Sequence, residues 1–418
     1  MEEPRICVGI MGGEMVYFVL KGRFVCGGMA VEGEERAEAR DGKVWWNGRL
    51  MDEVVFVACD GDGRFELEGV TIGVDFHWER REKQRFAGAL RLIVSEDDKG
   101  RLIAVNEIGI EEYLKSVISS EMSANASEAL LMAHAVISRS WLLRQLADRG
   151  KHSGAMTGGK GCVVVDGEMV DELVRWYDRE DHRQFDVCAD DHCQRYQGVT
   201  RQTTEAVEKA VDATRGMVLT WNGEVCDARF SKCCGGVTEL FENCWEETPH
   251  PYLERVEDCD GHGSDFCDTD DDEVLRQVLN DYDRETKDFY RWEVRYGADE
   301  FSELIRRRSG IDFGRVIEIE PLERGVSGRI VRLLIRGEKR QMVVGKELEI
   351  RRWLSDSHLR SSAFDVVCEG GDFVLRGKGW GHGVGLCQIG AAVMGAKGYG
   401  YDEILKHYFP KAELKKLY

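Results

Sequence analysis

The sequence predicts an α+β protein that mixes β-strands with a pair of helices and begins with a β-rich region. Short runs of β-branched and aromatic residues, separated by polar turns, fill the first hundred residues. The apolar period then changes to that of an amphipathic helix over residues 108–147. Strand-like runs return after residue 314. We therefore divide the chain into a β-rich region (1–100) and a larger mixed domain (101–418).

The β-rich region contains seven strand-like runs, with polar turns about ten residues apart. This spacing favours a sandwich, a barrel or an extended meander over βαβ units. Residues 97–102 are typical of a hairpin turn. The predicted strands are 6–10, 15–20, 23–31, 43–48, 53–59, 71–76 and 89–94.

A helical pair is predicted directly after this region, with a short polar connection between its members. Apolar residues recur at helical spacing in both members. The first helix covers 108–122, with its stripe at Ile110, Tyr113, Leu114 and Val117, and the second presents Leu130, Ala133, Val136, Ile137, Ser140 and Trp141.

The rest of the mixed domain begins with a polar, Asp-rich insertion at about 148–200 that contains Cys and His. Asn222-Gly223 predicts a hairpin turn further along the chain. The other expected elements are helices at 204–216, 273–282, 299–310 and 401–409, and strands at 316–324, 328–337 and 340–350.

The charge balance excludes some classes of partner. The 418 residues include 57 Lys and Arg against 77 Asp and Glu, so the net charge is −20. Nucleic acid and anionic membrane surfaces are disfavoured, because both need clustered cations. No apolar run is long enough for a transmembrane helix, and the first residues lack the pattern of a signal peptide.

Glu121 is a candidate general acid because it ends the first helix and opens the polar connection. Two packed helices would partly desolvate a carboxyl group at this point, and desolvation raises the pKa of a carboxyl. An ordinary solvated glutamate at a helix end is the competing interpretation, and spacing alone favours it.

The segment 377–390 combines six glycines with Trp380, His382, Cys387 and Gln388. Glycines allow close approach of the backbone to a ligand, while the Trp and His offer a stacking face and a proton-bearing ring. No Lys-Ser/Thr follows the glycines, so a phosphate-binding loop is not indicated. A tight structural turn with a satisfied His is the alternative.

Two further segments contain Cys. His182, Cys188 and Cys193 offer a zinc site, although a single Cys pair is a weaker signature than two CxxC knuckles. A Cys188–Cys193 disulfide and plain thiols remain open alternatives. The second segment, 231–245, holds Cys233, Cys234 and Cys244, for which buried thiols are the simplest interpretation.

These segments, in this order, resemble the SpoIID/LytB family of bacterial peptidoglycan enzymes. The resemblance spans about residues 90–410. It rests on EEYLKSVISSEMSANASEALLMAHAVISRSWLL, DVCADDHCQRYQG, ARFSKCCGGVTELFENCW and GKGWGHGVGLCQIGAAVMGAKGYGYDEILKHYFP.

The resemblance implies a lytic transglycosylase that cleaves glycan strands, preferably denuded of stem peptides, to 1,6-anhydro-muramyl products. Glu121 matches the family's catalytic Glu. A single carboxyl group suffices if the C6 hydroxyl of the sugar attacks its own anomeric carbon. Arg139, Trp380, His382 and Gln388 are the expected substrate-binding residues. A location in the cell envelope, the periplasm or outside the cell is also implied.

The resemblance also implies a structural zinc at His182, Cys188 and Cys193, with no cofactor needed for catalysis. Lys232, Cys233, Cys234 and Cys387 depart from the residues usual in the family. Two other functions stay open. Some relatives are amidase enhancers, so the chain could bind the wall and a cell-wall amidase without cleaving glycan. A zinc enzyme centred on the His-Cys-Cys set is the third.

Overall fold

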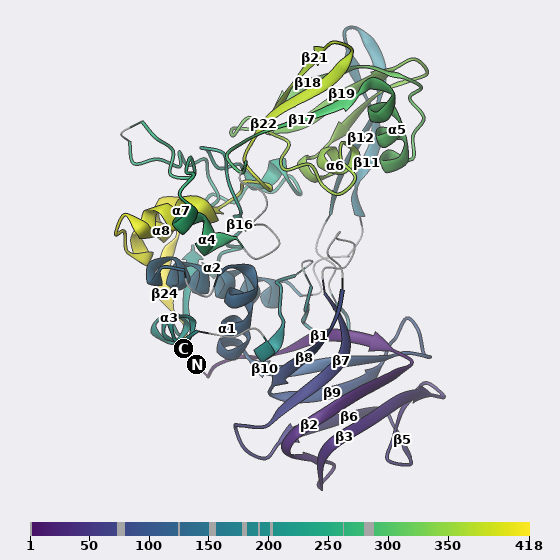
Figure 1. The fold of residues 1–418 in the computed structure, drawn as a ribbon, viewed down its shortest axis with the longest axis vertical. Coiled ribbons are helices and arrows are strands. Elements are labelled where there is room, and N and C mark those ends of the chain that lie inside the picture. The colour runs from purple at the N-terminus through teal and green to yellow at the C-terminus, as the bar shows by residue number, and fades with distance from the viewer. Residues whose placement is uncertain are drawn as a thin grey trace.

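The computed structural model describes residues 2–72, 80–123, 126–149, 156–177, 182–190, 193–200, 204–261, 263–279 and 288–418. Figure 1 shows an N-terminal β-rich part, a central helical part, and a second β-rich part at the opposite end. The two termini meet in the central part, where the Glu111 N–H donates to the Glu3 carboxylate and the Tyr418 hydroxyl donates to the Glu111 carboxylate.

The N-terminal part is one large sheet, in the order β13-β1-β10-β9-β6-β2-β3-β4-β5, with β7 on β2 and β8 on β7. Alternating apolar residues bury one face of its long strands. Its strands are β1 (Arg5–Gly13), β2 (Met15–Cys26), β3 (Met29–Arg40), β4 (Lys43–Trp46), β5 (Arg49–Met51), β6 (Glu53–Ala58), β7 (Arg64–Ile72), β8 (Arg80–Ala87), β9 (Ala89–Val94), β10 (Leu102–Gly109) and β13 (Val187–Cys188).

This sheet follows most of the predicted strands, and residues 97–100 form the turn between β9 and β10. The charged strand β8 was not predicted, because only a few of its residues face the core. Residues 73–76 of the predicted strand 71–76 lie outside the described residues.

The central part contains α1 (Ile110–Glu121) and α2 (Glu128–Ala147), which contact each other and the shorter helices around them. The side chain of Ser127 caps α2 by accepting a hydrogen bond from the Leu130 amide. The other elements are α3 (Glu205–Ala213), α4 (Asp272–Val278), α7 (Gln388–Ala396), α8 (Tyr401–Tyr408), β14 (Met217–Trp221), β15 (Glu224–Val225), β16 (Phe230–Ser231), β23 (Leu386–Cys387), β24 (Glu413–Lys416) and the 3-10 turns Gly198–Thr200 and Phe241–Asn243.

The second β-rich part pairs five strands in the order β11-β12-β20-β19-β18 and three in the order β17-β22-β21. Two helices, α5 (Ala298–Ser309) and α6 (Glu347–Trp353), pack against these strands. The strands are β11 (Met156–Val165), β12 (Glu168–Tyr177), β17 (Arg291–Gly297), β18 (Val316–Arg324), β19 (Ile330–Gly337), β20 (Gln341–Gly345), β21 (Phe364–Glu369) and β22 (Asp372–Lys378).

Two further stretches of the chain differ from the prediction. The stretch 148–200 contains the hairpin β11–β12, which extends the second β-rich part through parallel pairing of β12 with β20. Residues 347–350, predicted as strand, begin helix α6. The predicted turn at Asn222-Gly223 is confirmed. Both residues have positive φ, as a two-residue hairpin turn requires, and β14 and β15 pair across the turn.

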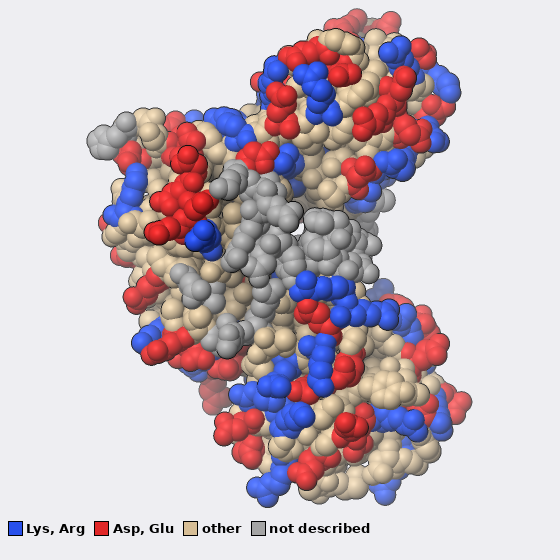
Figure 2. All heavy atoms as spheres, viewed as in Figure 1, with Lys and Arg blue, Asp and Glu red and all other residues tan. Residues whose placement is uncertain are grey.

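The apolar core does not break at residue 100. One large cluster of buried side chains runs from the N-terminal sheet through α1, α2 and α8, while residues of 292–375 with Leu173 form another. On the face in Figure 2, Lys and Arg are interspersed with Asp and Glu over both β-rich parts. None of the helices in the described residues is long and apolar enough to cross a membrane.

Candidate functional site

Glu121 is the last residue of α1 and is half-buried. Its Oε1 accepts a hydrogen bond from the backbone N–H of Arg195, at 3.0 Å. The chain just beyond it is also held, because the Ser123 N–H donates to the Gln277 carbonyl at the end of α4 (3.1 Å). Two separate segments therefore fix the end of α1 that carries the candidate acid.

The segment that holds Glu121 follows α1 for several residues. The Tyr113 hydroxyl donates to Gln194 (3.3 Å), and the Gln197 N–H donates to the Ser116 hydroxyl (3.2 Å). The rings of Tyr113 and Tyr196 stack with centroids 4.9 Å apart. Side chains spaced along one face of α1 thus determine where this segment lies.

The predicted zinc ligands lie together in the same segment. A ring nitrogen of His182 and the sulfurs of Cys188 and Cys193 all lie within 4.8 Å of one another. The Cys193 sulfur is 3.5 Å from His182 Nε2. A tetrahedral zinc separates a Cys sulfur from a His nitrogen by about 3.6 Å, given bonds of about 2.3 and 2.0–2.1 Å. The donor set and its spacing therefore fit zinc.

The disulfide alternative does not fit, because Cys188 and Cys193 are both free thiols. Cys193 lies two residues before Arg195, whose amide contacts Glu121. Burial, with added repulsion from Cys193 and Cys188, raises the pKa of Tyr113. The His-Cys-Cys set is thus connected to the Glu121 end of α1 through the chain from Cys193 to Arg195. His192, the other His of this segment, lies outside the described residues.

Arg139 is enclosed in the protein rather than exposed to a substrate. Its side chain is 0% exposed, and its Nε and Nη2 donate to the two carboxylate oxygens of Glu111, at 3.0 and 2.6 Å. Nη1 donates to the Met217 carbonyl (3.0 Å). Arg139 was predicted from the sequence to bind substrate. Helical spacing could not correct this prediction, because it does not show which residue an arginine pairs with. The structure argues against that role.

The glycines of 377–390 allow two backbone segments to approach each other closely. A Cβ on Gly385 would lie 2.1 Å from the Arg229 carbonyl oxygen, and one on Gly383 would lie 2.4 Å from the Arg329 guanidinium. Both glycines have positive φ. The short strands β16 and β23 pair at this contact. The glycine pattern is thus explained by packing, which was the structural alternative.

His382 and Trp380 are half-buried within this segment. The Nδ1 of His382 accepts from the Val384 N–H (3.0 Å), and its ring packs edge-on against Trp245. Burial, then the nearby Arg229 and Arg329, lowers the pKa of His382 well below its ordinary value. A neutral ring cannot hold a carboxylate by charge. Trp380 is partly buried, and its ring contacts Phe289 (centroids 5.1 Å apart) and the Arg360 guanidinium.

Gln388 is buried at the start of α7, and its Nε2 lies 3.2 Å from His134 Nε2. Since an amide nitrogen only donates, His134 accepts here and its Nδ1–H donates to Ser138 (3.1 Å). Burial lowers the pKa of His134 to about 3. Gln388 therefore joins the Gly-rich segment to helix α2.

Lys232 was not predicted as a site residue. In the sequence it was noted only as a departure from the residues usual in the SpoIID/LytB family. It is half-buried, and its Nζ donates to the Val278 carbonyl (2.8 Å) at the end of α4, beside the Gln277 that holds Ser123. Its carbonyl accepts from the Ile389 amide, next to Gln388. Lys232 thus supplies a positive charge where α4 meets the Gly-rich segment.

Two family models match the chain. The model "Stage II sporulation protein" matches residues 98–221, which contain Glu121 and the His-Cys-Cys set. A model of a domain of unknown function, DUF8618, matches residues 239–385.

Three relatives show the extent of the similarity. Stage II sporulation protein D of Bacillus amyloliquefaciens is 23% identical and covers 75% of this chain and 76% of its own length. An uncharacterized protein of Brachyspira hyodysenteriae is 26% identical over 87% of this chain and 76% of its own length. The amidase enhancer of Bacillus subtilis is 24% identical over 49% of this chain, but over only 32% of its own length.

Proposed function

We propose that this chain, which belongs to the SpoIID family through residues 98–221, cleaves peptidoglycan glycan strands with Glu121 as its acid and base. The family match and the relative named as an amidase enhancer support a cell-wall related role. The observation that carries the finer proposal is the placement of Glu121. It ends α1 half-exposed, and its carboxyl is held by the backbone of the segment that contains the zinc candidates.

The proposed reaction needs one carboxyl group and no water. Protonated Glu121 donates its proton to the glycosidic oxygen as the C1–O bond breaks. The C6 hydroxyl of the same muramyl sugar then bonds to C1, and the Glu121 carboxylate accepts the hydroxyl proton. The enzyme returns to its starting state, and the products are a free hydroxyl end and a 1,6-anhydro end.

The structure changes the set of residues that we propose to contact or position the substrate, which were predicted from the sequence as Arg139, Trp380, His382 and Gln388. Trp380, a partly buried ring beside Phe289 and Arg360, is the candidate for stacking on a sugar. Gln388 holds the Gly-rich segment against α2, and His382 packs as a neutral ring within it. Lys232 replaces Arg139 as the candidate cation for the lactyl carboxylates of denuded glycan.

Zinc at His182, Cys188 and Cys193 would act by holding structure. When bound there, the metal cross-links the segment whose Arg195 amide contacts Glu121. The carboxyl group, not the metal, then determines the chemistry. This arrangement favours a structural metal over a zinc enzyme.

The test is a comparison of products from denuded glycan strands, analysed by mass spectrometry. We expect 1,6-anhydro ends from the wild-type protein and none from Glu121→Gln. Glu112→Gln is the matched control, because Glu112 is an exposed residue of the same helix that pairs with Lys115. Anhydro products from Glu121→Gln at the wild-type rate would exclude the proposed role.

A second candidate, a non-catalytic amidase enhancer, is favoured by the relative of that name. It would place the chain in the cell envelope with glycan and a cell-wall amidase as its partners. An enhancer would bind denuded glycan without product and would stimulate an added amidase equally as wild type and as Glu121→Gln. The same two proteins therefore distinguish the two functions.

A further inference from the structure

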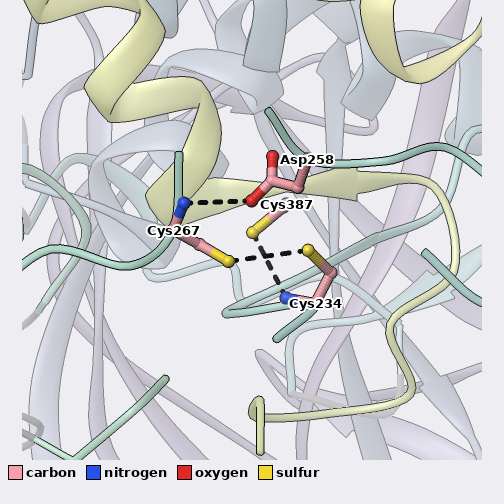
Figure 3. A group of neighbouring side chains, drawn as sticks. All are labelled: Cys234, Asp258, Cys267 and Cys387. Atoms are coloured by element: carbon pink, nitrogen blue, oxygen red, sulfur yellow. Dashed lines mark hydrogen bonds between the residues drawn. The ribbon is translucent and has the colours of Figure 1, made fainter. Parts of the chain in front are cut away.

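A second cluster of side chains that could bind a metal lies in the central part, apart from the His-Cys-Cys set. Figure 3 shows its members, Cys234, Asp258, Cys267 and Cys387, pointing toward one another. One ligand atom from each lies within 4.8 Å of every other, and all four residues are buried. They come from three stretches of chain that are far apart in the sequence, with Asp258 and Cys267 nine residues apart in one of them.

The spacing fits one metal ion and excludes a disulfide. The sulfurs of Cys234 and Cys267 are 3.7 Å apart, whereas a disulfide requires about 2.05 Å. Two thiolates on a tetrahedral zinc lie about 3.8 Å apart, given Zn–S bonds of about 2.3 Å. An iron–sulfur cluster would hold its ligands farther apart, because several metal ions lie between them.

Backbone and side-chain donors already orient the four groups. The amides of Cys234 and Gly390 donate to the Cys387 sulfur, at 3.2 and 3.5 Å, with Cys387 as the N-cap of α7. Asp258 accepts from the Cys267 amide at one oxygen (3.0 Å) and from the Tyr408 hydroxyl at the other (2.5 Å). Such outer hydrogen bonds are typical of residues that hold a metal.

Burial gives a physical reason for a cation at this point. Asp258 and the three Cys are enclosed, and a buried carboxyl beside three sulfurs is costly unless it is neutralised or paired. The partners of Asp258 in the structure are an amide, a hydroxyl and sulfur atoms. A divalent ion bound by three thiolates and one carboxylate would offset that cost.

We propose that Cys234, Asp258, Cys267 and Cys387 form a second, closed zinc site. With four protein ligands, the ion would be structural and would leave no position for water. Binding replaces thiol protons, which pass to solvent, and involves no change of oxidation state. The site is independent of the proposed glycan cleavage, because it is argued from these four residues alone.

The site would act as a clamp on the Gly-rich segment. Cys387 lies next to Gln388, and Cys234 lies two residues after Lys232. One ion would therefore fix the start of α7 and the chain after β16 to the loop that contains Asp258 and Cys267. The three Cys that replace usual family residues at 233, 234 and 387 are thereby largely explained. Cys233 is the remaining one, and it also contacts the sulfurs of Cys267 and Cys387.

The experiment is metal analysis of the full chain, purified under reducing conditions without chelator. We expect about two zinc ions per chain in the wild type, about one in Cys188→Ser, about one in Cys267→Ser and none in the double variant. Cys26→Ser, which changes a buried Cys of the N-terminal sheet, should keep both. One zinc retained by Cys188→Ser and lost from Cys267→Ser would support the second site even if the first site stays empty.

Either of two outcomes would overturn the second zinc site, and a third would contradict its proposed set of four ligands. One is a Cys188→Ser protein that contains no zinc together with a Cys267→Ser protein that contains as much zinc as the wild type. The other is a Cys234–Cys267 disulfide, found by mass spectrometry of the wild type, with no second metal. Zinc lost from Cys233→Ala and kept by Asp258→Ala would replace Asp258 by Cys233 as the fourth ligand and contradict the stated set. If Cys267→Ser does not fold, X-ray absorption of the zinc in the wild-type protein tests the ligand set instead. Three sulfurs and one oxygen are expected around the ion at the closed site.

Discussion

The two ends of α1 hold carboxyl groups in opposite surroundings. Glu111, in the first turn, is 1% exposed and receives hydrogen bonds from Arg139, the Gly216 amide and the Tyr418 hydroxyl. Glu121, at the last residue, is half-exposed and is held by the amide of Arg195. Both glutamates lie on the same helix, so the comparison separates a buried carboxyl that holds the fold together from a partly exposed one.

The largest effect expected is on activity, at the exposed end. Glu121→Gln removes the proposed proton donor but keeps the shape of the side chain and an acceptor for the Arg195 amide. We expect glycan cleavage to fall by about a hundredfold or more, the usual contribution of an acid–base group. Thermal unfolding should change little, by about 0.5 kcal/mol. A stable variant with unchanged cleavage would contradict the comparison.

The buried end should show the reverse pattern. Arg139→Met leaves Glu111 enclosed without its ion-pair partner, which costs about 3–5 kcal/mol of unfolding free energy. Denaturant unfolding measures this loss, and the KM for glycan of the folded fraction should stay the same. A raised KM with unchanged stability would restore Arg139 as a substrate ligand.

A smaller effect on activity is expected from the segment that holds Glu121. Cys188→Ser removes one ligand of the His-Cys-Cys set, whose Cys193 lies two residues before the Arg195 that holds Glu121. Loss of such support usually lowers activity by about 10–100-fold. Added zinc should restore Cys188→Ser only in part, while a chelator should bring the wild type to the same level. Full activity after zinc removal would show that the activity of Glu121 does not depend on the metal.

The pH dependence of stability tests the contact between α2 and the Gly-rich segment. The pKa of His134 is about 3 in the folded protein against an ordinary 6.5, so the unfolded chain binds more protons between these values. Stability is therefore lost as the pH falls below about 6.5, and His134 contributes a loss of about 2 kcal/mol between pH 7 and pH 5. His134→Gln should reduce the slope of unfolding free energy against pH in this range. An unchanged slope would show that His134 is not held neutral.

The sequence allowed prediction of features that depend on neighbouring residues. The two helices, the Asn222-Gly223 hairpin and the closely spaced Cys188 and Cys193 follow from local period, turn chemistry and ligand spacing. Glu121 was found through its place at a helix end together with a family resemblance, and its role stays a prediction.

Features that depend on distant contacts could not be predicted in the same way. Arg139 faces inward because it pairs with Glu111. The two residues are 28 positions apart in sequence, and the helical period of the apolar residues does not reveal such a pair. Asp258 and Cys267 carry no spacing signature, and only the fold brings them to Cys234 and Cys387. The hairpin β11–β12 was hidden in a polar stretch because several of its side chains are exposed.

The central claim, that Glu121 cleaves glycan without water, is tested most directly by digesting denuded strands in water labelled with heavy oxygen. We expect products lighter by one water than hydrolytic fragments, with 1,6-anhydro ends and no label at the new ends, from wild type but not from Glu121→Gln. Labelled reducing ends would show hydrolysis instead. No new ends from the wild-type protein, with both proteins stimulating an amidase equally, would contradict the account.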